Sequence, residues 1–248
     1  MKHRSIRTIF LMIVFLGNIS FLRAQELENI ILVGDNGITE DIKEAKNFIV
    51  IKKYPNATYE RLDYMLYGPL KKLRTYSDST LTVLSGRSYE YDNTGQLTYC
   101  GYYSNNKKDG EWSYMNDTGK VVKKERYENG VLVDPDVKDT SKKKDTLSYP
   151  DEREATFKKS PKDFKTYVER NIDQEAGDKS VKGGRVIVRF VVNTKGATDN
   201  IYLEKSVEYV LDEALIRVIR NSPLWTPAFQ NGKQLNAYRR QWVEFKKE

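Results

Sequence analysis

The side chains that most often carry catalysis are scarce in this chain. It contains one histidine, His3, and one cysteine, Cys100. His3 lies in a segment that we expect to be removed on export, so the mature chain would have no imidazole. Ser-His-Asp and Cys-His catalysis are therefore excluded, as is a zinc site built from cysteine and histidine. A single cysteine cannot form an internal disulfide, and we expect Cys100 to be a small buried or strand-facing residue.

The acidic residues do not form a catalytic or metal-binding pattern either. Asp212 and Glu213 open a predicted helix, where they complement the helix dipole, while Asp92 and Asp117 fall in predicted turns. The segment Gly34–Gly37 resembles the start of a calcium loop but lacks the later acidic ligands. The sequence has no phosphate-binding loop. We therefore predict a protein that is not an enzyme and that uses no metal or cofactor.

The last predicted strand, from about Leu235 to Phe245, offers a different kind of chemistry. Main-chain N–H and C=O groups on an open sheet edge can bind an extended peptide, and alternate side chains then give selectivity. A three-stranded sheet has two edges, and we place the last strand at one of them. The candidate peptide-binding residues are Tyr238, Arg239, Arg240, Gln241 and Trp242.

The stretch from Gly183 to Phe245 supplies the elements that would position this strand. Alternate apolar residues in Arg185–Val192 predict a half-buried strand, and a turn and a second extended segment follow. Leu211–Ile219 has the apolar spacing of an amphipathic helix. The dipeptide Asn231-Gly232 predicts a tight reversal before the last strand. One helix can cover one face of the resulting three-stranded antiparallel sheet.

Four short sequences in this stretch resemble the TonB C-terminal domain family. They begin at Gly184, Leu211, Trp225 and Gln230 and run Gly-Arg-Val-x-Val-x-Phe-Val-Val, Leu-Asp-Glu-Ala, Trp-x-Pro-Ala and Gln-Asn-Gly-Lys. The resemblance covers about Phe157 to Phe245. It implies a periplasmic α+β domain that recognises a short peptide of an outer-membrane transporter by strand addition, with the last strand as the usual partner.

Two residues of the last strand depart from the family pattern. Arg239 and Gln241 lie on the side that is usually apolar in the family. They indicate a shortened core, polar groups that meet a ligand, or side chains whose stems pack while their heads reach water. Trp225 and Pro227 are expected to close the corner between the helix and the following strand.

An internal repeat occupies the chain from about Tyr64 to Asp134. Three units align at Gly68, Gly95 and Gly119, each with an aliphatic residue two positions later and a tyrosine eight positions later. Segments rich in Tyr, Thr, Val and Trp lie between the glycine turns, so each unit is predicted to be a two-stranded hairpin. The units resemble the tyrosine- and glycine-rich hairpin repeats related to MORN repeats and found in some antitoxin-like proteins. Stacked hairpins would form one meander, in which aligned tyrosines either hold the sheet together or form a binding face.

The first 24 residues have the features of a secretory signal peptide. Basic residues precede an apolar core of about 11 residues, shorter than the ~20 that a spanning helix needs. We expect cleavage before Gln25 and a location in the periplasm or cell envelope. The alternative is retention as an inner-membrane anchor, which would be the protein's only membrane contact. Removal lowers the formal net charge from +7 to +3, which is too small to indicate nucleic-acid binding.

These features divide the chain into a signal peptide (1–24), a β-hairpin repeat domain (25–133), a charged linker (134–160) and a TonB C-terminal-like domain (161–248). The predicted fold class is α+β: an N-terminal antiparallel β-meander of hairpin repeats, then two helices on a three-stranded antiparallel sheet. The first helix spans Pro161–Ile172, with Ser160 as its N-cap. The linker has few large apolar groups and would span roughly 30 Å. The resemblance implies that a TonB-type energy transducer has an inner-membrane anchor and a long, stiff, proline-rich spacer, whereas only Pro135 and Pro150 lie in this linker. This departure counts against direct coupling to a membrane motor.

The predicted function is binding of short peptide segments of outer-membrane transporters by strand addition, as a contribution to TonB-dependent transport. The partner would be such a transporter or another envelope protein, and not nucleic acid. The alternative is an exported envelope scaffold whose repeats bind a second protein and which has no energy-transducing role.

Overall fold

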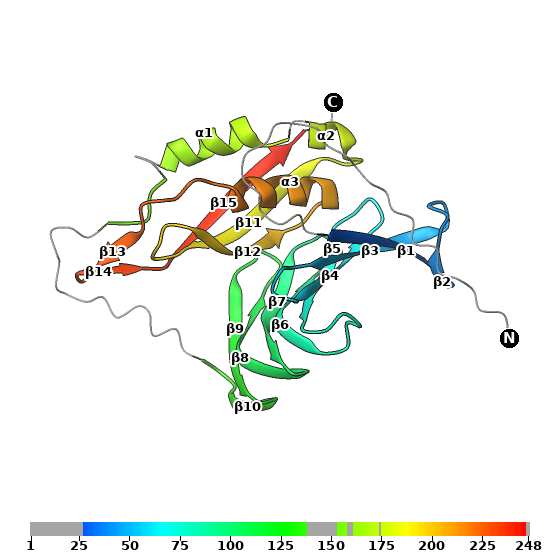
Figure 1. The fold of residues 1–248 in the computed structure, drawn as a ribbon, viewed down its shortest axis with the longest axis horizontal. Helices are drawn as coiled ribbons and strands as arrows, with labels where there is room; N and C mark the ends of the chain where they lie inside the picture. The colour runs from blue at the N-terminus through cyan, green and yellow to red at the C-terminus, as the bar shows by residue number, and fades with distance from the viewer. Residues whose placement is uncertain (1–26, 138–152, 158–160, 174, 247–248) are drawn as a thin grey trace.

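The computed structural model describes residues 27–137, 153–157, 161–173 and 175–246. The predicted signal peptide and residues 138–152 of the predicted linker lie outside this part of the chain. The described residues have the predicted α+β architecture, with a ten-stranded antiparallel sheet followed by a three-stranded sheet and its helices (Figure 1).

The N-terminal sheet is a meander in which most strands pair with their neighbours in sequence. Its order is β10-β9-β8-β7-β6-β5-β4-β3-β1-β2. The strands are β1 (Leu27–Gly34), β2 (Gly37–Thr39), β3 (Ala45–Lys53), β4 (Tyr59–Met65), β5 (Leu70–Tyr76), β6 (Leu84–Tyr91), β7 (Leu97–Ser104), β8 (Lys107–Met115), β9 (Val121–Glu128) and β10 (Val131–Asp134).

The three units of the repeat have the same strand register next to their turns. Tyr64 pairs with Leu70, Tyr91 with Leu97 and Met115 with Val121, and the register shifts by one residue beside each of these pairs. Gly95 and Gly119 adopt positive φ angles in the turns that follow, a conformation that glycine tolerates without steric cost. In the first unit the positive φ is at Tyr67, so the three units are hairpins of the same register in which the first turn has a different conformation.

The C-terminal unit places its helices on one three-stranded antiparallel sheet with the order β12-β11-β15. Its elements are α1 (Pro161–Asn171), α2 (Glu175–Lys179), β11 (Gly184–Val192), β12 (Thr198–Lys205), α3 (Tyr209–Arg220), β13 (Ala228–Gln230), β14 (Lys233–Leu235) and β15 (Ala237–Phe245). The face of β11 that carries Val186, Val188 and Phe190 is buried. Phe164 of α1 lies 5.8 Å from Phe190 between ring centroids, so the helices cover this face.

Trp225 closes the helix-to-strand corner, as predicted. Its ring is buried and lies 4.6 Å from Phe164 and 5.3 Å from Phe157 between centroids. Phe157 and Ala155, at the end of the predicted linker, are both buried, and Thr156 forms a bridge with Thr226. Residues 153–157 therefore belong to the packed C-terminal unit, because burying Phe157 adds one more ring to its aromatic core.

Two details differ from the sequence prediction. The short helix α2 was not predicted, and its Ala176 is buried against the unit. The last strand begins at Ala237, because Leu235 pairs with Ala228 in the separate β13–β14 hairpin. The hairpin turn itself is at Asn231-Gly232 as predicted, with both residues at positive φ.

The two units share one continuous core. Val50, Leu62, Tyr64 and Tyr91 of the repeat sheet join the same buried cluster as the apolar residues of β11 and α3. The repeat sheet thus packs against the C-terminal unit with one face and leaves its opposite face outside that cluster.

Candidate functional site

The candidate strand β15 lies at an edge of the C-terminal sheet. It pairs with β11 over its whole length, from Ala237 opposite Val192 to Phe245 opposite Gly184. In the described part of the chain, no other backbone segment pairs with β15. The geometry required for strand addition, a common sheet with an edge position for the last strand, is therefore present.

The five candidate residues divide between the two faces of β15. Tyr238 and Trp242 are 74% and 46% exposed, and Arg240 lies between them on the same outer face. Arg239 and Gln241 are half-buried on the opposite face, in line with the buried Phe245. The structure thus brings Tyr238, Arg240 and Trp242 together and separates the other two from them.

Arg239 and Gln241 bond to the protein's own main chain. The guanidinium of Arg239 donates to the carbonyl of Ala155 at 2.5 Å and to that of Tyr238 at 3.0 Å. It also lies 3.3 Å from the carboxylate of Glu154. The amide of Gln241 donates to the carbonyl of Trp242 at 2.9 Å. The sequence left three interpretations of Arg239 open. None describes it completely, because its guanidinium binds the main chain of the segment that leads into α1.

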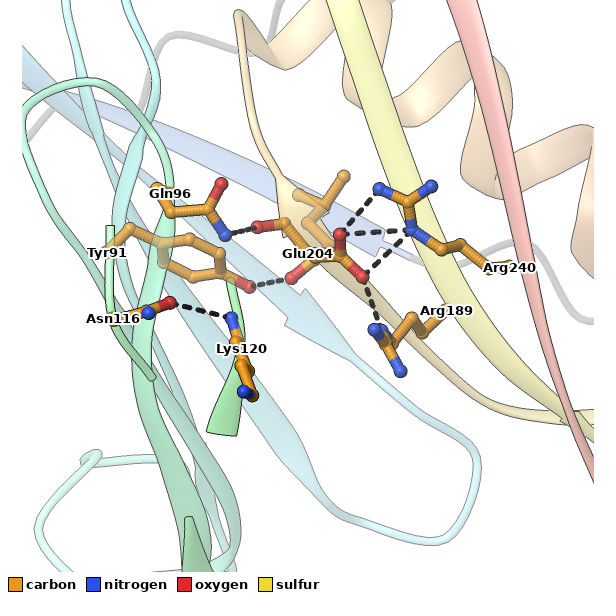
Figure 2. Close-up of polar contacts among 8 residues, drawn as sticks. Tyr91, Gln96, Asn116, Lys120, Arg189, Glu204 and Arg240 are labelled. Atoms are coloured by element: carbon orange, nitrogen blue, oxygen red, sulfur yellow. Dashed lines mark hydrogen bonds and ion pairs between the residues drawn. The ribbon is translucent and has the colours of Figure 1, made fainter. Parts of the chain in front are cut away.

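A buried carboxylate organises the outer face next to β15. Glu204 of β12 accepts hydrogen bonds from Arg240 at 2.8 Å and from Arg189 of β11 (Figure 2). Burial acts to raise the pKa of Glu204, but hydrogen bonds from Arg240 and Arg189 outweigh it, and the pKa is lowered. One acidic side chain therefore links all three strands of the sheet and restrains the guanidinium of Arg240.

Trp242 is held by a second ionic contact on the same face. Arg185 of β11 pairs with Glu244 at 2.6 Å, and its guanidinium carbon lies 4.7 Å from the centroid of the Trp242 ring. This distance is within the range of a cation–π interaction. The indole of Trp242 thus contacts a cation while 46% of the residue remains exposed.

The opposite edge of the sheet, β12, is covered by the repeat domain. The hydroxyl of Tyr91 donates to the carbonyl of Leu203 at 3.1 Å, and the amide of Gln96 donates to that of Glu204 at 3.0 Å (Figure 2). The N–H of Ser206 donates to the carbonyl of Gly95 at 2.9 Å. A hairpin turn of the repeat therefore satisfies main-chain groups at the β12 edge, and the two edges of the sheet are unequal.

A second cluster at the same junction surrounds Asp212, near the start of α3. Its buried carboxylate accepts hydrogen bonds from the hydroxyls of Ser206 at 2.5 Å and Tyr64 at 3.1 Å, and from the N–H of Val207 at 3.1 Å. Burial raises the pKa of Asp212 to about 7, although these hydrogen bonds act in the opposite direction. Beside it, Glu213 pairs with the buried Lys52 of β3 at 2.7 Å.

The role of these junction residues was not predicted from the sequence. Asp212 and Glu213 were expected only to complement the helix dipole, and neither Glu204 nor Gln96 was a candidate. The contacts between the two units join residues far apart in the chain, 108 positions for Gln96 and Glu204 and 148 for Tyr64 and Asp212, so no local spacing connects them. The one local signal was a charged residue, Glu204, directly after the extended apolar segment that ends at Leu203.

Other kinds of site receive no support from the described residues. Their His, Cys, Asp and Glu side chains form no group of three or more that could hold a metal ion. None of the helices in this part of the chain has the length and apolar character needed to cross a membrane. Cys100 is partly buried on β7, and burial raises the pKa of its thiol to about 11, which makes it a poor nucleophile.

The C-terminal unit also has a relative among known families. Residues 176–246 match the family model described as Gram-negative bacterial TonB protein C-terminal. The matched range runs from α2 to the end of β15 and confirms the resemblance for this part of the chain, which indicates a TonB-like envelope protein. No curated protein and no solved structure matches the chain.

Proposed function

We propose, from the TonB-like character of residues 176–246, that this protein binds an extended segment of another envelope protein by strand addition to β15. The favoured partner is a transporter of the outer membrane, and the binding would contribute to TonB-dependent transport. The protein would act in the periplasm or cell envelope after export, without catalysis or a cofactor.

The observation that carries the proposal is the difference between the two sheet edges. Unpaired N–H and C=O groups at a sheet edge are a template for another strand. At β12 the side chains of Tyr91 and Gln96 already use the carbonyls of Leu203 and Glu204. At β15 the main chain pairs with β11 on one flank, so a strand from a partner protein would pair with the other flank.

Side chains on the outer face would give the selectivity. A strand added beside β15 places every second side chain next to Tyr238, Arg240 and Trp242. Because Glu204 and Arg185 hold Arg240 and Trp242 in place, these contacts are organised before the partner arrives. Arg239 would limit the register, since its guanidinium already bonds the main chain of Ala155.

The experiment compares peptide binding by the wild-type protein and a Gln241→Pro variant. Proline removes a main-chain donor from the strand, so we expect short peptides of outer-membrane transporters to bind the wild type and to lose most of their affinity for the variant in calorimetry. Asn236→Pro, just before β15, is the matched control and should bind normally. Circular dichroism checks that both variants fold.

A second measurement covers the case in which Gln241→Pro disturbs the pairing with β11. Peptides N-methylated at every second residue lose the donors on one flank only, because successive residues direct their N–H groups to opposite sides. One methylated series should lose binding and the other should keep it. Equal binding of both series, or of the wild type and Gln241→Pro, would contradict strand addition.

The alternative is an envelope scaffold with no energy-transducing role, and one observation favours it. The repeat sheet and the C-terminal unit share a single core, so the protein can present the surfaces of both units, held together, to its partners. The N-terminus of the exported protein separates the two ideas. A soluble form that begins at Gln25 supports the scaffold, whereas an intact Met1 in the membrane fraction supports energy transduction.

A further inference from the structure

The face of the repeat sheet that points away from the C-terminal unit carries an ordered row of polar and aromatic side chains. Residues directly opposite each other on neighbouring strands lie on the same face of a sheet. From β9 to β4, one residue of each strand is connected to the next strand by such a pair. The row consists of Lys123, Tyr114, Tyr99, Glu90, Lys72 and Asp63. We call the face that contains this row the tyrosine face.

Aromatic rings fill the part of the tyrosine face over β7, β8 and β9. Trp112 is fully buried, although it lies outside the core shared with the C-terminal unit. It is covered by its own neighbours: the ring centroid of Tyr103 lies 5.1 Å away and that of Tyr127 6.4 Å away. A Cβ on Gly101 would lie 2.2 Å from the indole, so the ring rests directly on the main chain of β7. The half-buried tyrosines around it form the accessible surface.

The centre of this face has more cations than carboxylates. Glu90 is shared by two cations, Lys72 at 3.0 Å and Arg74 at 3.3 Å. Lys108 forms no ion pair with any described residue; its ammonium lies 4.3 Å from the centroid of Trp112 and 4.7 Å from that of Tyr127. An aromatic surface attracts a cation but does not neutralise its charge. An acidic group is therefore the partner that this centre lacks.

Two side-chain donors on the tyrosine face have no hydrogen-bond acceptor. Arg74 Nε and Trp112 Nε1 are buried and make no hydrogen bond to any described residue. A buried donor without an acceptor costs free energy, and natural structures usually satisfy such groups. Both groups can only donate. Trp112 is enclosed by its neighbours, whereas the side chain of Arg74 is 32% exposed, so the guanidinium of Arg74 is the group that an oxygen acceptor from outside can meet.

The margins of the face restrict the partner further. Toward β4, Arg61 pairs with Asp63 at 2.7 Å, and toward β9, Lys123 pairs with Glu125 at 2.5 Å. Each margin is therefore close to neutral, and the excess positive charge is confined to the centre of the face. A continuous polyanion, such as nucleic acid or an anionic lipid surface, would find cations without carboxylate partners only at this centre. A protein segment with spaced acidic residues and apolar residues between them fits the alternation of charge and rings.

We propose that the tyrosine face binds an acidic, extended segment of a second protein. Carboxylates of that segment bond Arg74 and Lys108, and its apolar side chains lie on the rings of Tyr99, Tyr103 and Tyr127. This site is separate from β15, and binding here does not require the proposed strand addition.

The test uses a labelled peptide of alternating glutamate and valine, and a lysine and valine peptide as its counterpart, in fluorescence anisotropy at low ionic strength. Lys108→Gln and Arg74→Gln should each weaken binding of the acidic peptide by about tenfold, the effect of one hydrogen bond to a charged group. Lys124→Gln is the matched control, because Lys124 lies on the other face of β9, where it pairs with Glu111. It should bind within about twofold of the wild type, since a distant surface charge contributes little.

Several outcomes would overturn the proposal. The acidic peptide could fail to bind the wild type, or bind all three variants equally, or bind no better than the lysine peptide. Binding to vesicles of phosphatidylglycerol without binding to the peptide would assign the face to lipid instead. Thermal melts of the variants separate loss of binding from loss of fold: a folded Lys108→Gln variant that binds normally is sufficient to reject the site.

Discussion

The pH dependence of stability tests whether Asp212 is buried where the two units meet. Its carboxylate is fully buried and is bonded by Ser206 of its own unit and by Tyr64 of the repeat sheet. Burial raises the pKa of Asp212 from 3.8 to about 7 in the folded protein. The folded state then binds a proton more tightly than the unfolded state, so the associated stability is present in full below about pH 4 and is lost as the pH rises to about 7.

The size of the effect follows from the difference between the folded and unfolded pKa of Asp212. A tenfold difference in proton affinity corresponds to about 1.4 kcal/mol, so the full change is about 4 kcal/mol, of which about 3 kcal/mol falls between pH 5 and pH 8. We expect the free energy of unfolding to fall by about this amount over that range. Asparagine is a neutral replacement of similar shape, so Asp212→Asn should have nearly constant stability over the same range.

Urea unfolding at a series of pH values, followed by tryptophan fluorescence, measures this slope. Asp178→Asn is the matched control, because Asp178 is exposed on α2, and it should keep the wild-type slope. Glu204 and Glu90, whose pKa values are lowered because their hydrogen-bond partners outweigh burial, act in the opposite direction, but mainly below about pH 4.5, near their ordinary pKa. Identical slopes for the wild type and Asp212→Asn would refute the burial of an ionisable group at this junction.

Two further predictions concern the packing of the repeat and of the linker end. Gly95→Ala should destabilise the protein by about 3 kcal/mol in thermal or urea unfolding, because the added Cβ would lie 2.2 Å from the carbonyl of Ser206 at a positive φ. Gly110→Ala, at positive φ with open space around it, should cost only about 1 kcal/mol, and equal costs would mean that the turn does not contact β12. Phe157→Ala should cost about 4 kcal/mol, since Phe157 is fully buried. A loss below about 1 kcal/mol, typical of surface sites, would mean that residues 153–157 belong to the linker and not to the packed unit.

The repeat has a clearer role in the structure than in the sequence. Its equivalent tyrosines were expected either to hold the sheet together or to form a binding face. Tyr64 stacks on its cross-strand partner Phe48, which agrees with the first expectation. In addition, Tyr64 and Tyr91, at the same position of two successive units, donate to Asp212 and to the carbonyl of Leu203. Trp112 and its tyrosine neighbours lie on the opposite face. The two faces of one repeat thus have different partners, because successive residues of a strand point to opposite sides.

Much of the architecture could be predicted from local pattern. Period-two apolar residues located β11, the spacing of Leu211, Leu215 and Ile219 located α3, and repeated glycines located the hairpin turns. These predictions succeeded because the periodicity of side chains and the conformational needs of turns act over a few residues. The short helix α2, the start of β15 and the burial of Phe157 were missed, because tertiary packing decides each of them.

By itself, the sequence determined the fold class, the order of the hairpins and helices, the TonB-like character of the C-terminal stretch and the choice of the last strand as the candidate site. Only the tertiary structure decided which edge of the C-terminal sheet is covered, and that Asp212 and Glu204 lie where the units meet. The physical reason is distance along the chain. Contacts such as that between Tyr64 and Asp212 join residues 148 positions apart, and no local periodicity or turn chemistry encodes a pairing at that range.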